Sequence, residues 1–242
     1  MKNIVTFLFL FVFVSLNAQT FMIPGDVTLE KKYIKNEKYQ MKWYIIQDTA
    51  KHEVARINTE IKPGKTRLSI LTNVQVNNAK TSWIDSTIVA LPTLAPIRHY
   101  SDNLERGVSL TFGTSVKGNY NDKMKKVKTP IDDAAPQGQY FDSNFYPYLI
   151  RLLPLKEGYT QNIAIYDYSP AKKGILGAQI KNVKTGVVKT KAGLNAVWIV
   201  TSMETIKGQT TEVKYYIDKA DRKIYKQEIF DGMMHTLIER VE

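Results

Sequence analysis

Apolar and polar side chains alternate in the stretch Arg67-Leu-Ser-Ile-Leu-Thr-Asn-Val-Gln-Val76. Four of its five even-numbered residues are apolar, and four of its five odd-numbered residues are polar or charged. A period of two residues is typical of a strand with one buried face and one solvated face. Residues 67–76 are therefore predicted to form a half-buried β-strand.

The same alternation recurs along much of the chain, most clearly in residues 108–117 and 212–218. Trp198 lies in the run 196–201, which is rich in β-branched residues and is also typical of a strand. Turn-forming residues separate these runs, at 63–64, 121–125, 191–193, 207–208 and 219–222. We expect antiparallel neighbours, roughly nine to twelve strands in a meander that curls into a barrel, a half-barrel or a sandwich.

One segment departs from this alternation and predicts a short amphipathic helix over residues 144–153. It follows an expected irregular loop, 129–140, and two residues of types that cap helices, Asp142 and Ser143. Its apolar residues recur at helical spacing and end at Pro154: Phe145, Tyr148, Leu149, Leu152 and Leu153. A lone apolar helix in a curled sheet most simply covers the open face of that sheet.

The predicted fold is mainly β, a curved antiparallel sheet that forms an open or incomplete barrel with one short covering helix. No internal repeat or linker-like tract divides the chain. We therefore expect a single β-rich domain over residues 19–242.

The first 18 residues have the pattern of a signal peptide, with Lys2, an apolar run over 4–16 and Ala18 before the expected cleavage site. The run is shorter than the roughly 20 apolar residues of a membrane-spanning helix, so an uncleaved anchor is the less favoured alternative. We expect a periplasmic or secreted protein without a transmembrane segment after cleavage. The sequence has no cysteine, which excludes disulfides, a thiol nucleophile and a cysteine-linked lipid anchor.

The formal net charge of +11 favours anionic partners such as acidic lipid head groups or polysaccharide, although basic surfaces also serve solubility. Nucleic acid is not expected as a partner of an exported protein. A basic cluster flanks Met124 and Val127 at a predicted hairpin tip: Lys123, Lys125, Lys126 and Lys128. Each lysine contributes about 1 kcal/mol near an anionic membrane surface. Alternatively, these lysines protect an exposed strand edge from aggregation.

Candidate catalytic and metal-binding groups do not form a recognisable pattern. His52, His99 and His235 are far apart and lack metal-ligand spacing, so we expect them on the surface or in hairpins. Ser115 lies between Gly113 and Gly118, but it falls in a strand pattern rather than at a strand-to-helix turn.

Two pairs of aspartates, Asp132 with Asp133 and Asp218 with Asp221, lie in loop or turn sequence, where aspartate commonly bonds to the local backbone. Their spacing does not match a calcium-binding loop. We therefore expect no catalytic residue, no metal and no cofactor.

The apolar residues of the predicted helix are the candidate ligand-binding residues. Phe145, Tyr148, Leu149 and Leu152 either line a pocket for an apolar or amphiphilic ligand between helix and sheet, or fill the core. In the first case the helix acts as a lid that moves to exchange the ligand.

Two stretches resemble known families: Phe141-Asp-Ser-Asn-Phe-Tyr-Pro-Tyr-Leu-Ile-Arg-Leu-Leu-Pro-Leu-Lys-Glu-Gly158, and Tyr215-Tyr-Ile-Asp-Lys-Ala-Asp-Arg-Lys-Ile-Tyr-Lys-Gln-Glu-Ile229. The first resembles the helix and Leu-Pro-Leu-x-x-Gly turn of an exported bacterial family known as domain of unknown function 3108. The second resembles a hairpin of that family and of the broader LolA/LolB-like group of periplasmic lipoprotein carriers.

This resemblance implies a strongly curved antiparallel sheet around a helical plug, in the periplasm of a Gram-negative cell. The carriers hold acyl chains in the groove between sheet and helices, and the resemblance implies no catalytic residue. We expect a non-enzymatic protein that binds or carries a lipid-like ligand, with a lipid or lipoprotein as partner. One alternative is an interaction protein of the cell envelope with a filled core, no ligand and another envelope protein as partner. The other is an enzyme whose catalytic residues are dispersed in the sequence.

Overall fold

The computed structural model describes residues 21–79, 83–170, 173–206 and 209–241. Within these ranges the chain forms one sheet of 16 strands, the short helix α1 (Tyr146–Leu149) and the 3-10 turns η1 (Lys31–Tyr33) and η2 (Ile150–Leu152). The predicted signal peptide and the predicted turn at 207–208 lie outside the described residues. Among the described helices, none has the length and apolar character needed to cross a membrane.

Two antiparallel meanders make up nearly all of the sheet. The first has eight strands: β2 (Glu37–Gln47), β3 (Ala50–Pro63), β4 (Arg67–Val76), β5 (Trp83–Ala90), β6 (Pro96–Asp102), β7 (Arg106–Phe112), β8 (Val116–Asp122) and β9 (Val127–Asp133). The second has six: β11 (Gln161–Tyr168), β12 (Lys173–Thr190), β13 (Gly193–Ile206), β14 (Gln209–Asp218), β15 (Ile224–Phe230) and β16 (His235–Arg240). Pairing of β16 with β2 joins them, and the short strands β1 (Phe21–Met22) and β10 (Phe141–Asp142) lie parallel to β11.

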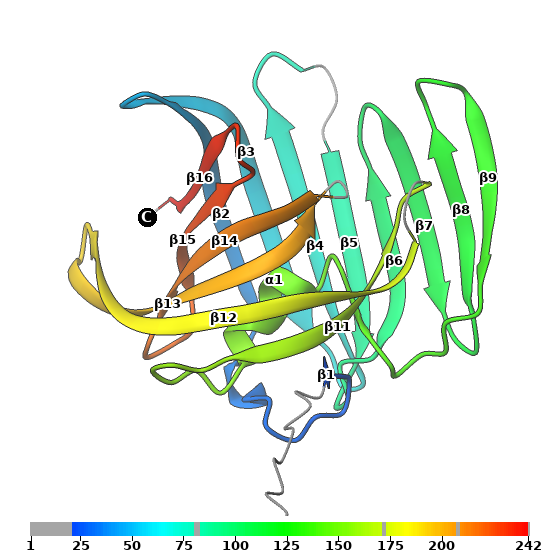
Figure 1. Ribbon diagram of the computed structural model, residues 1–242, viewed down its shortest axis with the longest axis horizontal. Coiled ribbons are helices and arrows are strands. Elements are labelled where there is room, and N and C mark those ends of the chain that lie inside the picture. Colours follow the sequence, from blue (N-terminus) through cyan, green and yellow to red (C-terminus); the bar gives the residue numbers. More distant parts are fainter. Residues whose placement is uncertain (1–20, 80–82, 171–172, 207–208, 242) are drawn as a thin grey trace, which may run out of the picture.

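The sheet curls until it overlaps itself without closing into a barrel, and β9 ends it (Figure 1). The overlap is evident at β11, because the two faces of this strand pack in different cores. Ile163 and Ile165 pack in the inner core with α1, whereas Ala164 and Tyr166 pack in a second core with β7, β8 and β9. The ring of Tyr166 lies 5.7 Å from that of Phe112. The prediction of a mainly β, incomplete barrel is confirmed.

The number of strands exceeds the expected nine to twelve, because the alternation continues in phase through tight turns. Residues 108–117 were expected to be one strand, but a turn at 113–115 divides them between β7 and β8, so Ser115 lies in a turn. The expected irregular loop at 129–140 begins only after Asp133, since β9 includes Pro130. Proline is tolerated there because β9 is an edge strand with one unpaired side.

The predicted helix is shorter than expected and forms a plug in the core. Residues 144–153 contain only the four residues of α1 followed by η2. Phe145, rather than Asp142 or Ser143, is at the N-cap position of α1, and no side chain caps the helix. The two expected caps instead bond to other elements, Asp142 to His99 and Ser143 to Asp167. The helix is therefore not amphipathic, since the sheet buries it on its different sides.

A buried ion-pair network holds this plug in place. Arg151, which is 1% exposed, donates from Nη2 to Glu37 Oε2 at 2.8 Å and from Nε to the Arg222 carbonyl at 2.6 Å. Arg240 donates from Nη2 to the other oxygen of Glu37 at 2.8 Å. Burial raises the pKa of Glu37, but attraction and hydrogen bonds from Arg151 and Arg240 outweigh it and the net pKa is lowered. The network fastens η2 to β2 and β16.

Candidate functional site

Two cavities lie inside the curled sheet, on different sides of the segment that leads into α1. The apolar cavity has a volume of about 220 Å³, and the charged cavity has a volume of about 290 Å³. Ser143 lines both, so this residue belongs to the walls of the two cavities. Inward-facing residues supply the walls because side chains alternate between the two faces of each strand.

The apolar cavity lies between α1 and the strands β2 to β5, β15 and β16. Aliphatic side chains form much of its wall: Met41, Ile57, Ile61, Ile70, Ile224 and Ile238. Most of the remaining wall is polar and includes one carboxyl group: Tyr39, Thr59, Thr72, Asp85, Asn144, Tyr148 and Gln227. Such a wall suits an apolar chain.

The charged cavity lies between α1 and the strands β11, β12 and β13, beside the first residues of β5 and β7. Its apolar and aromatic wall consists of Trp83, Tyr146, Ile165, Leu176 and Ala178. Arg106, Asp167 and Glu204 add one positive and two acidic side chains. Trp83 and Arg106 begin β5 and β7, whereas Asp167 and Glu204 lie near the ends of β11 and β13, and all four line this cavity.

Glu204 has the most perturbed carboxyl group of this cavity. Its Oε1 accepts hydrogen bonds from Ser202 Oγ at 2.5 Å and from Tyr215 Oη at 2.8 Å. Burial raises the pKa of Glu204 to about 7, and the two hydroxyl groups only partly oppose this rise. Near neutral pH this carboxyl therefore gains or loses a proton with small changes in its surroundings.

Trp83 Nε1 and Tyr146 Oη are buried donors of the charged cavity. Trp83 Nε1 has no hydrogen-bond partner among the described residues. Tyr146 is 3% exposed, and burial raises its pKa well above the usual value, although the nearby Ser202 hydroxyl partly opposes this rise. Since buried polar groups are normally hydrogen-bonded, Trp83 Nε1 marks a place for an acceptor group of a ligand or for water.

A buried histidine lies beside the segment that leads into α1 and contradicts the expectation of a surface position. His99 Nδ1 lies 2.7 Å from Asp142 Oδ1, and Asn144 Nδ2 lies 3.4 Å from His99 Nε2. Burial lowers the pKa of His99, but the Asp142 carboxylate outweighs burial and the net pKa is raised. The pair links β6 to β10 and thereby fastens the overlap of the sheet. The sequence signal was its place on the inward face of β6, two residues before the buried Ser101.

The other expectations for polar residues have mixed outcomes. His52 is exposed, and His235 stacks on Phe230 beside the β15–β16 hairpin with ring centroids 4.3 Å apart. Asp218 is a turn former as predicted, since its Oδ1 accepts from the backbone nitrogens of Ala220 and Asp221. In the described part of the chain, no group of three or more His, Cys, Asp or Glu side chains is arranged to hold a metal ion.

The four candidate ligand-binding residues lie beside the apolar cavity rather than around it. Phe145, Leu149 and Leu152 are completely buried in the inner core. Tyr148 alone among the four lines the apolar cavity. Burial raises its pKa to about 12. The sequence located the segment, but the cavity walls come mainly from inward residues of the strands.

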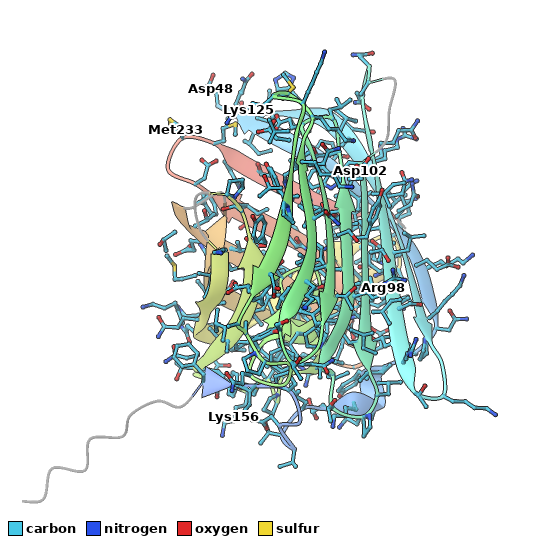
Figure 2. All side chains as sticks on the ribbon, turned by 90° about the vertical axis from the view of Figure 1, so that its right-hand side faces the viewer. Asp48, Arg98, Asp102, Lys125, Lys156 and Met233 are labelled. Atoms are coloured by element: carbon cyan, nitrogen blue, oxygen red, sulfur yellow. The ribbon has the colours of Figure 1, made fainter. Side chains whose placement is uncertain are left out.

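The lysine cluster lies at the β8–β9 hairpin, where Figure 2 labels Lys125. Lys123 Nζ donates to Asp102 Oδ2 at 2.8 Å and to the Asn103 carbonyl at 2.6 Å. Lys125 Nζ lies 3.7 Å from Asp122 Oδ2, and Lys126 has a positive φ of 57° in the turn. Lys128 belongs to β9 itself. Two of the four lysines are therefore partly neutralised by neighbouring aspartates.

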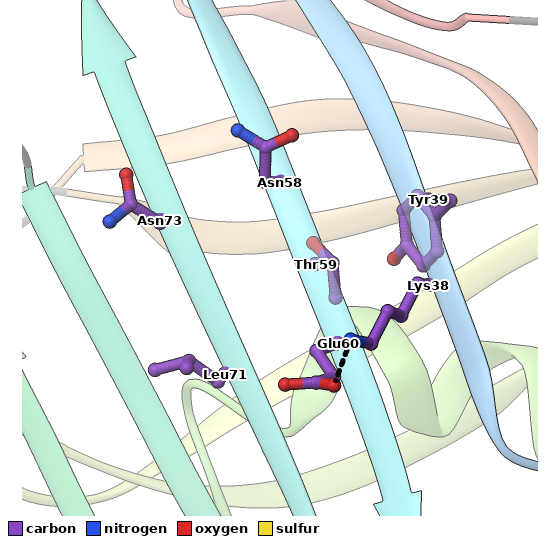
Figure 3. A pocket seen from close by; sticks show the side chains of 7 residues that line it. All are labelled: Lys38, Tyr39, Asn58, Thr59, Glu60, Leu71 and Asn73. Carbon is purple, nitrogen blue, oxygen red and sulfur yellow. Dashed lines mark ion pairs between the residues drawn. The ribbon is translucent and has the colours of Figure 1, made fainter.

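A shallower depression of about 410 Å³ lies on the outer face of β2, β3 and β4 (Figure 3). Its charged side chains pair with each other, since Lys38 Nζ lies 2.7 Å from Glu60 Oε1 and Lys62 Nζ lies 2.9 Å from the same atom. Gln40 donates to Asn58 Oδ1 at 2.9 Å. Because the charged side chains of this depression, Lys38 and Glu60, already pair with each other, we assign the candidate site to the two interior cavities instead.

Comparison with known proteins adds a family to this description. No curated protein matches the chain. The sequence model of one family, Protein of unknown function (DUF3108), matches residues 38–237. This range includes both meanders almost completely and nearly every residue of the two cavities. The chain therefore belongs to the DUF3108 family of proteins of unknown function.

Proposed function

We propose that the protein is a non-enzymatic binding protein that holds an amphiphilic, lipid-like ligand in the two cavities beside α1, outside the cytoplasm. The observation that carries this proposal is the difference between two cavities that share Ser143 in their walls. Six aliphatic side chains line one of them, together with polar groups and the Asp85 carboxyl, and the other contains Arg106, two carboxyl groups and the unpartnered Trp83 Nε1. A molecule with an apolar chain and a polar head matches this contrast.

The size of the cavities supports a ligand that occupies both. Pockets for drug-sized ligands have volumes of about 300–1,000 Å³. Each of the two cavities is smaller than this, with about 220 and about 290 Å³. Each methylene of an acyl chain that is buried in the apolar cavity contributes about 0.8 kcal/mol to the binding free energy. A ligand that fills this cavity and extends past Ser143 is therefore favoured.

The ligand enters and leaves at the strand ends beside Trp83 and Arg106, and α1 stays in place. Movement of α1 as a lid would separate the fully buried Phe145 and Leu149 from the core. It would also displace Arg151, which follows α1 in the chain. Loss of the ion pair between Arg151 and Glu37 would leave a buried charge unpaired. The charged cavity needs no such rearrangement because it lies at the ends of strands, beside the first residues of β5 and β7.

The test begins with native mass spectrometry of the protein purified without detergent from the cells that produce it, followed by lipid extraction. We expect an additional mass of lipid size, released by organic solvent. Thr72→Phe fills the apolar cavity, whereas Ser69→Phe adds the same ring to the outer face of the same strand. We expect Thr72→Phe to lose the bound mass and Ser69→Phe to keep it.

A folded wild-type protein that neither carries nor takes up lipid would refute the proposal. That result would favour the interaction protein of the cell envelope, which cross-linking would then test. Circular dichroism of both variants establishes that a lost ligand does not reflect a lost fold.

A further inference from the structure

Three charged side chains of the charged cavity have no ion-pair partner among the described residues. Arg106 makes no ion pair or side-chain hydrogen bond among the described residues, although Asp122 lies opposite it in β8. Asp167 accepts one hydrogen bond, from Ser143 Oγ at 3.0 Å. Glu204 accepts its two hydrogen bonds on Oε1, which leaves Oε2 without a donor. Opposite charges thus line one small space without neutralising one another.

This arrangement differs from that of other charged groups in the core. Arg151, Arg240 and Glu37 neutralise one another directly in the network below α1. Charges that line a cavity and remain unpaired cost free energy unless a ligand or water satisfies them. The donor Trp83 Nε1 belongs to the same cavity and likewise lacks an acceptor among the described residues.

We propose that the charged cavity binds a zwitterionic head group that combines an ammonium with a phosphate. The ammonium lies against Glu204 and Asp167, and the phosphate lies against Arg106 with Tyr146 and Trp83 as further donors. This inference rests on the proposed function, since it names the polar part of the same ligand.

The charges of the cavity disfavour the simpler head groups. A purely anionic head group pairs with Arg106 but is repelled by Asp167 and by ionised Glu204. A purely cationic head group pairs with the two carboxyl groups but leaves Arg106 and Trp83 without an acceptor. A zwitterion satisfies both sets, and hydrogen bonds between charged groups are the stronger ones.

The protonation of Glu204 makes this binding dependent on pH. The groups that face or surround its carboxyl are Ser202 and Tyr215 on the sheet, Tyr146 on α1, and Arg106 and Asp167 across the cavity. Burial raises the pKa of Glu204 to about 7, so the carboxylate that attracts an ammonium forms as pH rises through this value. Affinity for the zwitterion therefore increases from pH 6 to pH 8.

The inference is tested by calorimetric binding of dihexanoyl phospholipids below their micelle concentration at pH 8, with ethanolamine or glycerol on the phosphate. We expect wild type to bind the ethanolamine lipid about tenfold more tightly, as one additional charge-assisted hydrogen bond implies. Glu204→Gln abolishes this preference, because it weakens binding of the ethanolamine lipid and removes the repulsion of the anionic glycerol lipid. Arg106→Gln weakens both, and Glu212→Gln, at an exposed position of β14, changes neither.

Different failures of this experiment have different meanings. Equal binding of both lipids by wild type and by Glu204→Gln overturns the head-group inference and leaves the proposed function intact. Failure of wild type to bind either lipid overturns the proposed function and the inference with it. Free phosphoethanolamine that binds as tightly as the lipid supports the charge assignment but contradicts an amphiphilic ligand.

Discussion

Replacement of Glu204 by glutamine tests whether the folded protein holds a carboxyl group at an energetic cost. Glutamine keeps an oxygen that accepts from Ser202 and Tyr215, and it resembles the protonated acid in shape and charge. The pKa of Glu204 rises from an ordinary 4.5 to about 7 on folding. The folded state thus binds the proton more tightly than the unfolded state, so wild-type stability falls as pH rises from 4.5 to about 7.

The size of the effect follows from this difference in pKa. At about 1.36 kcal/mol for each pH unit, Glu204 lowers wild-type stability by about 3 kcal/mol above pH 7 and by less than about 1 kcal/mol at pH 5. Solvent in the cavity reduces these values. We therefore expect Glu204→Gln to gain about 2 kcal/mol relative to wild type between pH 5 and pH 8.

The assay is urea unfolding of wild type, Glu204→Gln and the exposed control Glu212→Gln at both pH values, with protein freed of lipid. His99 also titrates with pH, but it is present in all three proteins and cancels in the comparison. A difference between Glu204→Gln and wild type that is the same at pH 5 and pH 8 would refute the reasoning, because it would mean that Glu204 ionises as freely in the folded protein as in the unfolded chain.

Two further predictions concern the interactions that hold the sheet around its plug. Arg151→Met leaves Glu37 with Arg240 as its remaining partner and should lower the free energy of unfolding by about 3–5 kcal/mol in urea, whereas a loss below about 1 kcal/mol contradicts a buried ion pair. His99→Gln removes the link to Asp142 and should cost about 1–3 kcal/mol. Because its pKa is raised in the folded state, His99 stabilises wild type below pH 6.5 and loses this effect as pH rises, so a variant that costs more at pH 8 than at pH 5.5 contradicts the assignment.

The alternation of apolar and polar residues was sufficient to predict a strand wherever one face of that strand is exposed to solvent. The alternation in residues 67–76 predicted β4 with the bounds that it has, and Asp218 was recognised as a turn former from its neighbours alone. Alternation did not reveal the turn around Ser115. Apolar residues face inward both before and after this tight hairpin, so the alternating pattern continues through it. It also did not reveal that Tyr146, Tyr148 and Leu149 of α1 are all buried, because helical spacing describes one face at a time.

The sequence by itself determined that this chain forms a curled antiparallel sheet with an apolar plug, since alternation, turns and spacing are properties of neighbouring residues. Only the tertiary structure decided which inward residues meet. Arg106 and Glu204 lie on β7 and β13, and they share a cavity because the sheet curls until these strands flank the same side of α1. The burial that raises the pKa of Glu204, and the approach of Asp142 to His99, arise from residues far apart in the chain. Such interactions depend on distance in space, which strand patterns do not specify.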